Sequence, residues 1–391
     1  MDEMVKKQND VVRITEWNDA GFTGKGIKVW DMESPTSDHG IKTHQRILDA
    51  APDADVLNRG WSFKLSGSEL EFERVWDPSA KEYVGLREFV DRKEFDILTA
   101  SLGGGTNTTY KWLGPILRES QAKHKFLAFN SAGNDGDVLK GGLMPQDVAY
   151  YIAACVLYKG DPKDIRVSGY SSQGDEYEEV DFCTFVGPSA WNGTSFSTPY
   201  LAGTTALLLQ RYGFMSKDEV YNYYKMIAKP LNVVPNAVRT DFVGGSYIYD
   251  FKAGYGIPIL PKLDKRYLTI KINDPVIYLN GRSDGVMDTA PFIKDSRTFV
   301  PVAFIALHLG ANVTWHPLTR RVVITKDNKQ IDLYIDKKNF YINGKRYEMD
   351  TAPFIKDQRT FVPVSFIALA LGCRVAWAND IRTVQILEMG E

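Results

Sequence analysis

An internal repeat constrains the fold of this chain more than any other feature of its sequence. The segment DTAPFIKDSRTFVPVAFIALHLG at 288–310 returns as DTAPFIKDQRTFVPVSFIALALG at 350–372, and 20 of these 23 positions are identical. Shared secondary-structure preference does not produce such identity, so the C-terminal third contains two copies of one unit. We place the two copies at 263–327 and 328–391.

Each copy is predicted to be a small α+β module. An Asn-Gly pair indicates a two-residue hairpin, a later Pro can open a helix, and a Gly can close it. The predicted helix is apolar nearly all round, which predicts burial against the strands of its own copy. A second hairpin is expected at the end of each copy. The signals are Asn280, Gly281, Pro301 and Gly310 in the first copy, and Asn343, Gly344, Pro363 and Gly372 in the second.

Residues 1–262 are expected to form one α/β domain before the repeats. Short apolar segments such as GIKVW, ADVLN, FDILTASLGG and KFLAFNSAGN alternate with helical patterns such as THQRILDAA and WLGPILRESQAK. This alternation predicts a parallel sheet with helices on both faces. The Pro- and Gly-rich GYGIPILPKLDKRY at 254–267 marks the boundary to the repeats.

Composition narrows the possible partners and locations. The 391 residues are 44% hydrophobic and 25% charged with a net charge of −2, which gives no support for nucleic-acid or membrane partners. No apolar run approaches the roughly 18 residues of a membrane span, and the N-terminal MDEMVKKQNDVVR lacks the apolar core of a secretion signal. We expect a cytoplasmic or phage-associated protein. Three scattered cysteines predict neither a disulfide framework nor a cysteine-ligated metal.

Chemically useful residues follow several of the predicted strands. Asp31 and Glu33 end GIKVWDMES, Ser101 ends FDILTAS, and Asn134 ends FLAFNSAGN. The carboxyl ends of parallel strands meet at one edge of a sheet. Together with His39 in SDHG and Ser195 in WNGTSFSTPYLAG, this edge would hold a nucleophile, a base, an acid and an amide donor.

These motifs, in this order, resemble the subtilisin-like serine proteases over residues 10 to 260. NGTSFSTP matches the family's nucleophile motif, NSAGNDG its oxyanion strand, SLGG its peptide-pairing strand, and DHG its His-Gly. The resemblance implies Ser195 as nucleophile, His39 as base and Asn134 as oxyanion donor. It also implies that peptide substrate binds at Ser101, Leu102, Gly103 and Gly133. No cofactor and no metal are expected.

Glycine and proline around Ser195 predict a sharp turn that leads into a helix. Gly193 permits a tight backbone turn before the serine, and Pro199 is expected at an early helical position, where its missing N–H is no loss. His39 is preferred as base over His44, because His39 adjoins Gly40 as in the family motif.

Two acids compete for the third place of the triad. Ungapped alignment of GKGIKVWDMES puts Glu33 at the family's Asp position, while Asp31 lies two residues earlier on the same strand face. His39 follows Glu33 by only six positions, so a loop usual in the family is missing. We predict that Glu33 accepts the hydrogen bond from His39 Nδ1, with Asp31 as the alternative.

The repeats resemble the module named after the copper amine oxidase N-terminal domain, through DTAPFIKDxRTFVPVxFIA. Copper(II) prefers imidazole ligands, but His308 and His316 lie in the first copy only, so copper is not expected. The copies are interpreted as binding or assembly modules with a possible cell-surface or phage-particle partner. The predicted function is a serine endopeptidase acting on protein or peptide substrates through an acyl-enzyme on Ser195. The alternative is an inactive pseudoprotease that serves as a binding or structural protein of a phage or cell-surface assembly.

Overall fold

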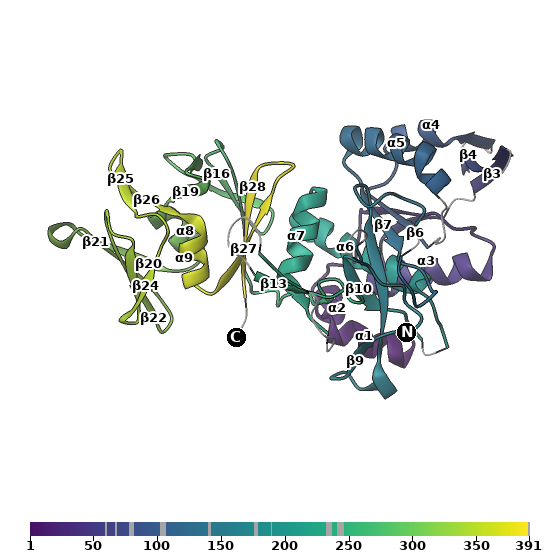
Figure 1. The fold of residues 1–391 in the computed structure, drawn as a ribbon, viewed down its shortest axis with the longest axis horizontal. Coiled ribbons are helices and arrows are strands. Elements are labelled where there is room, and N and C mark those ends of the chain that lie inside the picture. The colour runs from purple at the N-terminus through teal and green to yellow at the C-terminus, as the bar shows by residue number, and fades with distance from the viewer. Residues whose placement is uncertain are drawn as a thin grey trace. The chain divides into compact units, whose positions relative to one another are not determined.

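A computed structural model describes residues 1–58, 61–66, 69–77, 82–101, 107–139, 142–175, 179–188, 190–231, 237–240 and 246–389 (Figure 1). The chain divides into two compact units. The first contains Met1–Val220, Ile227–Arg239 and Tyr247–Leu260, and the second contains Tyr221–Met226, Thr240–Ser246 and Pro261–Glu391. Two short segments from before residue 262 thus belong to the second unit.

The first unit is built on a largely parallel sheet with the order β10-β8-β7-β6-β1-β2, to which β9 adds antiparallel beside β8. The strands are buried on both faces, as a parallel sheet covered by helices requires. The predicted α/β fold class is confirmed. The strands are β1 (Lys28–Asp31), β2 (Asp55–Asn58), β6 (Ile97–Ala100), β7 (Leu127–Ser131), β8 (Tyr150–Leu157), β9 (Ile165–Val167) and β10 (Phe182–Phe185).

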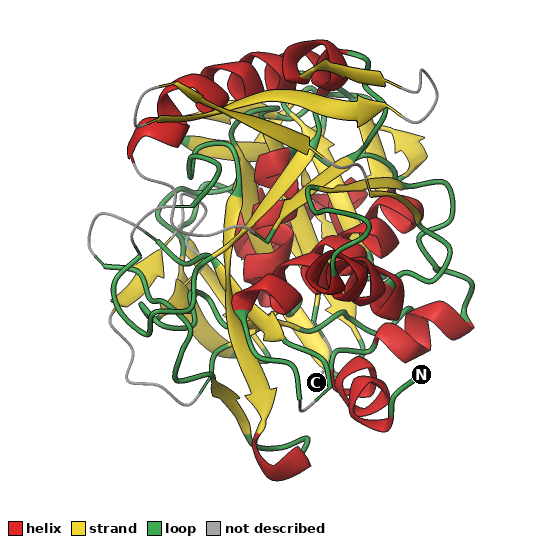
Figure 2. Cartoon of the chain, turned by 90° about the vertical axis from the view of Figure 1, so that its right-hand side faces the viewer, coloured by secondary structure: helices red, strands yellow, loops and turns green. Residues whose placement is uncertain are grey.

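Helices cover both faces of this sheet (Figure 2). α3 (Asp38–Ala50) and α6 (Thr194–Tyr212) pack together on one face, where α6 runs across five of the strands. α4 (Leu86–Asp91) and α5 (Asn107–His124) lie on the other, over a core that includes Trp30. Because Trp30 points to the α4–α5 face, its neighbour Asp31 points to the α3–α6 face. The remaining helices of this unit are α1 (Glu3–Val11), α2 (Ile14–Asp19), η1 (Tyr158–Gly160) and the first turn of α7 (Lys217–Ile227).

Several strands of the first unit were not predicted from the sequence. Between β2 and α4 in the sequence, three strands form an antiparallel sheet. β11 pairs with β14 as a short two-stranded ribbon. The strands are β3 (Trp61–Ser66), β4 (Glu69–Asp77), β5 (Glu82–Gly85), β11 (Ala228–Lys229) and β14 (Ile257–Pro258). β12 (Ala237–Thr240) and β13 (Ser246–Tyr249) pair as a further ribbon. The boundary between the two units falls within each of these strands.

The second unit holds the two sequence copies in three antiparallel sheets, ordered β17-β16-β15-β28-β27, β18-β19-β26-β25 and β20-β21-β22-β23-β24. The first copy provides β15 (Tyr267–Lys271), β16 (Val276–Leu279), β17 (Arg282–Val286), β18 (Phe292–Lys294), β19 (Arg297–Pro301), α8 (Val302–His308), β20 (Asn312–His316), η2 (Pro317–Thr319) and β21 (Arg321–Lys326). The second provides β22 (Lys329–Tyr334), β23 (Asn339–Ile342), β24 (Lys345–Glu348), β25 (Phe354–Lys356), β26 (Arg359–Pro363), α9 (Val364–Ala370), β27 (Cys373–Ala378) and β28 (Thr383–Glu388).

The predicted hairpin and helix signals of each copy are confirmed. Asn280 and Gly281 both have positive φ between β16 and β17, as a type I′ turn requires, and Asn343 and Gly344 repeat this in the second copy. α8 begins directly after Pro301 and α9 directly after Pro363.

The pairing of the strands differs from the prediction, because the copies share their sheets. β15 of the first copy pairs with β28 of the second, and β21 pairs with β22. In the middle sheet, β19 pairs with β26 around Val300 and Val362. A single core contains apolar side chains of both copies, so neither helix is buried against its own strands alone.

Reciprocal ion pairs also join the two copies. Arg297 of the first copy donates through Nε to Asp350 Oδ2 at 2.7 Å, and Arg359 of the second binds Asp288 of the first. Equivalent residues therefore exchange partners across a local two-fold relation.

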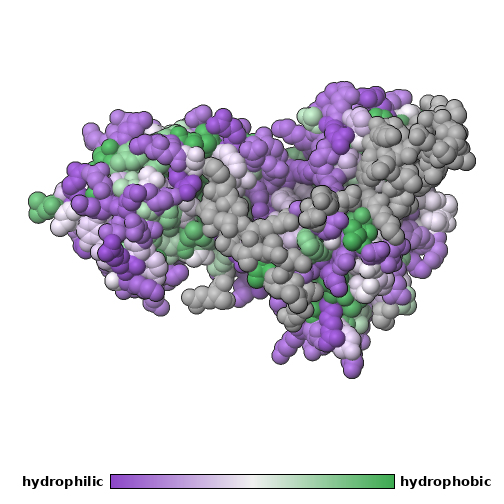
Figure 3. Space-filling model, viewed as in Figure 1, coloured by the Kyte–Doolittle hydropathy of each residue, from purple (hydrophilic) through white to green (hydrophobic). Residues whose placement is uncertain are grey.

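The visible surface is mostly hydrophilic, with scattered apolar residues among those described (Figure 3). In the described part of the chain, no helix combines the length and the apolar character that a membrane crossing needs.

Candidate active site

The segment from β1 to α3 brings the predicted base against one of the two predicted acids. Glu33 follows β1, and its Oε2 lies 3.2 Å from His39 Nδ1. The Glu33 side chain is only 7% exposed and His39 is 40% exposed, so the carboxylate is shielded while the imidazole faces solvent. This hydrogen bond to Glu33 raises the pKa of His39, and burial of the ring partly opposes the increase.

A tight turn sets the direction of His39. Ser37 caps α3, since its Oγ accepts from the Gly40 N–H at 2.8 Å and donates to the Ser34 carbonyl. A Cβ at Gly40 would lie 2.0 Å from the Ser34 carbonyl oxygen, so only glycine fits. The glycine that follows His39 in the sequence is therefore a packing requirement of this turn.

Asp31, the alternative acid, binds elsewhere. It is fully buried, and its Oδ2 accepts from Thr43 Oγ1 of α3 at 2.7 Å. Burial raises the pKa of Asp31 to about 8, and the nearby carboxylate of Glu33 adds to the increase. Asp31 thus ties β1 to the helix that carries His39 without contacting the imidazole by a hydrogen bond in the described structure.

Ser195 is the second residue of α6 and is bonded to the end of β6. Its Oγ donates to the Ser101 carbonyl at 3.1 Å, and Ser101 Oγ donates to the Ser195 carbonyl at 2.8 Å. Gly193, with φ 135°, makes the turn that precedes the helix. The backbone N–H of Ser195 belongs to the first turn, where α-helices leave their amides without intrahelical partners.

The expectation for Pro199 was wrong. Pro199 is the sixth residue of α6, beyond the first turn, so its missing N–H removes the bond that the Ser195 carbonyl would otherwise accept. The hydroxyl of Ser101 supplies the donor instead. The Ser195 carbonyl is therefore bonded to Ser101, which follows β6, and not to a residue of α6.

Asn134 is oriented by the residue before Ser195. Its Oδ1 accepts from the backbone N–H of Thr194 at 2.8 Å and from the Thr194 hydroxyl at 3.1 Å. Because a backbone amide can only donate, the side-chain oxygen must face Thr194 and the Nδ2 group must point away. Thr194 Oγ1 also accepts from the N–H of Gly133 at 3.1 Å. Asn134 is exposed, so Nδ2 can donate to a bound molecule.

The structure brings most of the predicted residues together but does not join the nucleophile to the base. In the part of the chain that the structure describes, Ser195 makes no hydrogen bond to His39. The Phe196 ring, next in sequence to Ser195, lies 5.5 Å from the His39 ring. His44, the rival base, is half-buried on α3, and its side chain makes no hydrogen bond to the described residues. The predicted substrate residues Leu102 and Gly103 lie outside the described residues.

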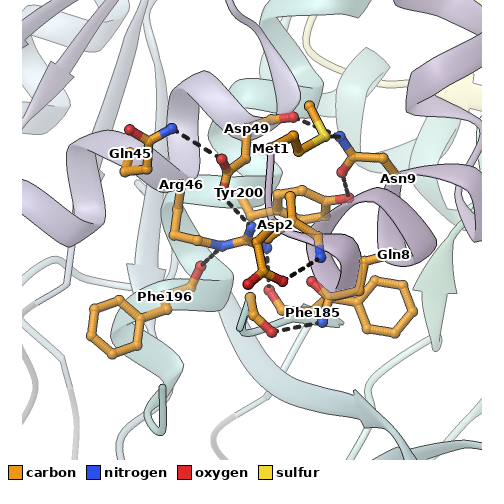
Figure 4. A network of polar contacts seen from close by, with 12 residues as sticks. Met1, Asp2, Gln8, Asn9, Gln45, Arg46, Asp49, Phe185, Phe196 and Tyr200 are labelled. Carbon is orange, nitrogen blue, oxygen red and sulfur yellow. Dashed lines mark hydrogen bonds and ion pairs between the residues drawn. The ribbon is translucent and has the colours of Figure 1, made fainter. Parts of the chain in front are cut away.

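Sequence reasoning missed a buried network that connects the two helices of the site (Figure 4). Arg46 of α3 is fully buried, and its guanidinium stacks on the Tyr200 ring at 4.1 Å. It donates to the carbonyls of Phe185 at 3.0 Å and Phe196 at 3.4 Å and pairs with Asp49. The sequence signal for this network was Arg46 itself, a charged residue that falls on the buried face of the predicted helix, seven positions after His39.

Neither unit offers an evident metal centre in its described residues, where no group of three or more His, Cys, Asp or Glu side chains could hold an ion. His308 of the first repeat is engaged locally. Its Nδ1 lies 2.8 Å from the Phe304 carbonyl oxygen and its ring stacks on the Phe304 ring.

The copper amine oxidase N-terminal domain model matches the C-terminal region at residues 259–307 and 278–386. The repeats resemble that domain. The match agrees with the resemblance read from the repeated motif. Among curated proteins, no sequence matches this chain.

Among solved structures similar to this chain, three have low sequence identity and TM-scores below 0.5. The prenylagaramide maturation protease PagA shares 18% identity at a TM-score of 0.42, over 56% of this chain and 89% of its own. Fervidolysin from Fervidobacterium pennivorans, a keratinolytic enzyme related to subtilisin, shares 14% at 0.42, over 68% of this chain and 48% of its own. MycP1 without its propeptide shares 17% at 0.41, over 64% and 94%.

Proposed function

We propose that this chain is a serine endopeptidase that cleaves peptide bonds through an acyl-enzyme on Ser195. The observation that carries the proposal is the hydrogen bond of 3.2 Å between His39 Nδ1 and the buried Glu33 carboxylate. A carboxylate at Nδ1 fixes the imidazole tautomer, so Nε2 is left as the basic nitrogen. This is the state that a general base needs.

In the proposed acylation step, Ser195 Oγ attacks the carbonyl carbon of the scissile peptide bond. The hydroxyl first rotates away from the Ser101 carbonyl, its acceptor in the described structure. His39 Nε2 then takes the hydroxyl proton, and Glu33 stabilises the imidazolium that forms. His39 returns the proton to the leaving amine, and water activated by the same imidazole later hydrolyses the ester.

The oxyanion of each tetrahedral intermediate would lie between two donors. One is Asn134 Nδ2, whose direction is set by the bonds from Thr194 to Oδ1. The other is the Ser195 N–H at the start of α6, where the helix dipole adds a favourable potential. In subtilisin, loss of one such side-chain donor lowers the rate by about 10²–10³-fold, and we expect an effect on that scale here.

The proposal is tested by labelling the intact chain with a fluorophosphonate that reacts with activated serines. We expect stoichiometric labelling that Ser195→Ala abolishes and His39→Ala strongly reduces. Ser197→Ala is the matched control, because Ser197 lies on the same helix and its hydroxyl bonds only within the first turn. Labelling that persists in Ser195→Ala would remove Ser195 from the mechanism.

A second candidate is an inactive pseudoprotease that binds a partner in a phage or cell-surface assembly. The bond from Ser195 Oγ to the Ser101 carbonyl, where a protease would use His39, favours it. A folded protein that shows no labelling between pH 6 and 9 would support this candidate over the enzyme.

For the second unit, the proposal is a binding or assembly module that presents the protease domain to a partner. The sharing of sheets by the two copies supports a single rigid body with one interaction face, not two independent ones. Deleting 263–391 should leave labelling of Ser195 unchanged while abolishing any partner binding.

A further inference from the structure

Asp31 and Glu33 form an unusual pair of buried acids beside His39. Asp31 is the last residue of β1, Glu33 follows it by two residues, and both carboxyls bond to side chains of α3. Each carboxyl has one oxygen that accepts a hydrogen bond: Asp31 Oδ2 from Thr43, and Glu33 Oε2 from His39. The other oxygen of each, Asp31 Oδ1 and Glu33 Oε1, is buried without a hydrogen-bond partner in the described structure.

If both acids were ionised, the two buried oxygens without donors would be energetically unfavourable. A buried carboxylate oxygen without a donor is costly, and two neighbouring carboxylates repel each other. If one acid keeps its proton, that proton supplies a donor, and the other acid supplies the acceptor. A proton shared between Asp31 Oδ1 and Glu33 Oε1 would satisfy both oxygens and remove one of the two charges.

The surroundings decide which acid keeps the proton. Glu33 bonds directly to His39, whose positive form stabilises a carboxylate, whereas the hydrogen-bond partner of Asp31 is the neutral hydroxyl of Thr43. The strand neighbours of Asp31 are Asn58 on β2 and Thr99 on β6, both uncharged. α6 carries no charged residue between 194 and 210. α3 carries Asp38, Lys42, Arg46 and Asp49 besides His39, but the charges that act on Asp31 are those of His39 and Glu33.

We propose that Asp31 is a neutral carboxylic acid that donates its proton to Glu33 Oε1, and that it thereby positions Glu33 for His39. This role rests on the proposed peptidase function. Glu33 is then held at both oxygens, by His39 on one side and Asp31 on the other. Asp31 itself is held by Thr43, which links the pair to α3. It is a positioning residue, since it acts on His39 only through Glu33.

The arrangement predicts an alkaline limit to activity. Burial raises the pKa of Asp31 to about 8, so its proton is present at neutral pH and lost above that value. Ionisation then removes the donor to Glu33 and adds a second negative charge. Glu33 loses its orientation, and reaction at Ser195 slows.

The test compares Asp31→Asn with Asp31→Ala in the intact chain, using the rate of fluorophosphonate labelling between pH 6 and 10. The asparagine amide donates as the neutral acid does but cannot ionise. We expect Asp31→Asn to lose the decline near pH 8 and to react faster than Asp31→Ala at neutral pH. Asp31→Ala should be slower by about 100-fold, the scale of a misplaced catalytic group. An unchanged decline in Asp31→Asn, or equal slowing in both variants, would overturn the proposal.

An NMR titration of the His39 ring in Ser195→Ala tests the same pair without catalysis and without altering Asp31. We expect the chemical shifts of the His39 ring to change in a step near pH 8, and this step should disappear when Asp31→Asn is added. Thr43→Val, which removes the donor to ionised Asp31, should move the step to higher pH. Labelling without this step would refute the acid pair and leave the peptidase intact. The step without labelling would refute the peptidase and leave the acid pair.

Discussion

At the scale of single residues, Glu33 determines whether His39 can act as a base. The Glu33→Gln variant keeps the shape of the side chain but removes the charge that stabilises the imidazolium. We expect turnover to fall by about 10⁴-fold, as the equivalent change does in a chymotrypsin-type triad. The pKa of His39, which the bond to Glu33 raises, should fall, so the acid limb of the pH profile should move to lower pH. Peptide turnover between pH 4 and 8 measures both effects.

Glu33→Asp serves as the comparison for that variant. It keeps the charge but is one methylene shorter, so it should restore only part of the rate if the carboxylate can no longer reach His39 Nδ1. Full activity in Glu33→Gln would show that the contact with His39 has no catalytic role.

Asp31 should make the stability of the fold depend on pH. Its pKa is raised from 3.8 to about 8, so between these values the folded chain binds a proton that the unfolded chain has released. The free energy of unfolding therefore decreases as pH rises from about 4 to about 8, by up to roughly 1.4 kcal/mol per pH unit. Urea unfolding of Ser195→Ala at pH 5, 6, 7 and 8 measures the slope.

Asp31→Asn should remove most of that slope. The raised pKa of His39 contributes a further loss of stability above its ordinary value of 6.5, so a smaller decrease near pH 7 should remain. Identical slopes in the two proteins would mean that Asp31 is ionised at neutral pH.

Much of the candidate site could be predicted at this scale, because its motifs are local. Ser195, Asn134 and the spacing to Glu33 are visible in short segments of sequence. Ser101 was predicted only as a substrate-binding residue, and neither its bond to Ser195 nor the bond of Thr43 to Asp31 could be predicted, since these contacts form only after α3 and β6 have packed. Sequence periodicity does not specify which hydroxyl reaches which carbonyl.

At the scale of elements, α6 depends on a bond from outside the helix. Ser101→Ala would leave the buried Ser195 carbonyl without its side-chain donor, at a cost of about 1–3 kcal/mol. In a Pro199→Ala background, the new N–H can bond to the same carbonyl. We expect the cost of Ser101→Ala to fall by at least half there. Urea unfolding of the four proteins in this cycle gives the coupling, and additive effects would contradict it.

The elements themselves were predictable to different degrees. Strands β1, β6 and β7 follow from short apolar runs, and α3 and α6 from strong capping and turn signals. The sheet β3-β4-β5 was missed, although WSFKLS in β3 and ELEFE in β4 alternate apolar and polar residues, because the prediction followed only the strand–helix alternation of the parallel sheet.

At the scale of the whole molecule, the two repeats should not fold separately. Each copy lacks strand neighbours that the other provides, at β15–β28, β19–β26 and β21–β22. We expect 263–391 to unfold cooperatively, whereas 263–327 and 328–391 should each lack a dispersed NMR spectrum as monomers. A well-dispersed spectrum from either single copy would contradict the shared core.

The exposed ion pairs between the copies should contribute little to this coupling. Asp350 and Arg297 are each more than a third exposed, and such pairs contribute about 1 kcal/mol or less. Asp350→Asn is therefore the control that should leave 263–391 folded. The repeat was evident from sequence, but the exchange of strands was not, because identical segments can pair within a copy or between copies with similar local contacts.

The pairing of β15 with β28 also determines how the second unit responds to a stretching force. These strands are antiparallel neighbours, and Tyr267 near the start of the unit faces Leu387 near its end. Tension applied at both ends would peel the two strands apart from that pair inward, breaking the hydrogen bonds one after another instead of all at once in shear. A tether that pulls on this unit would therefore open it as a zipper opens, at low force, and would separate the two copies from their common sheet in the first step.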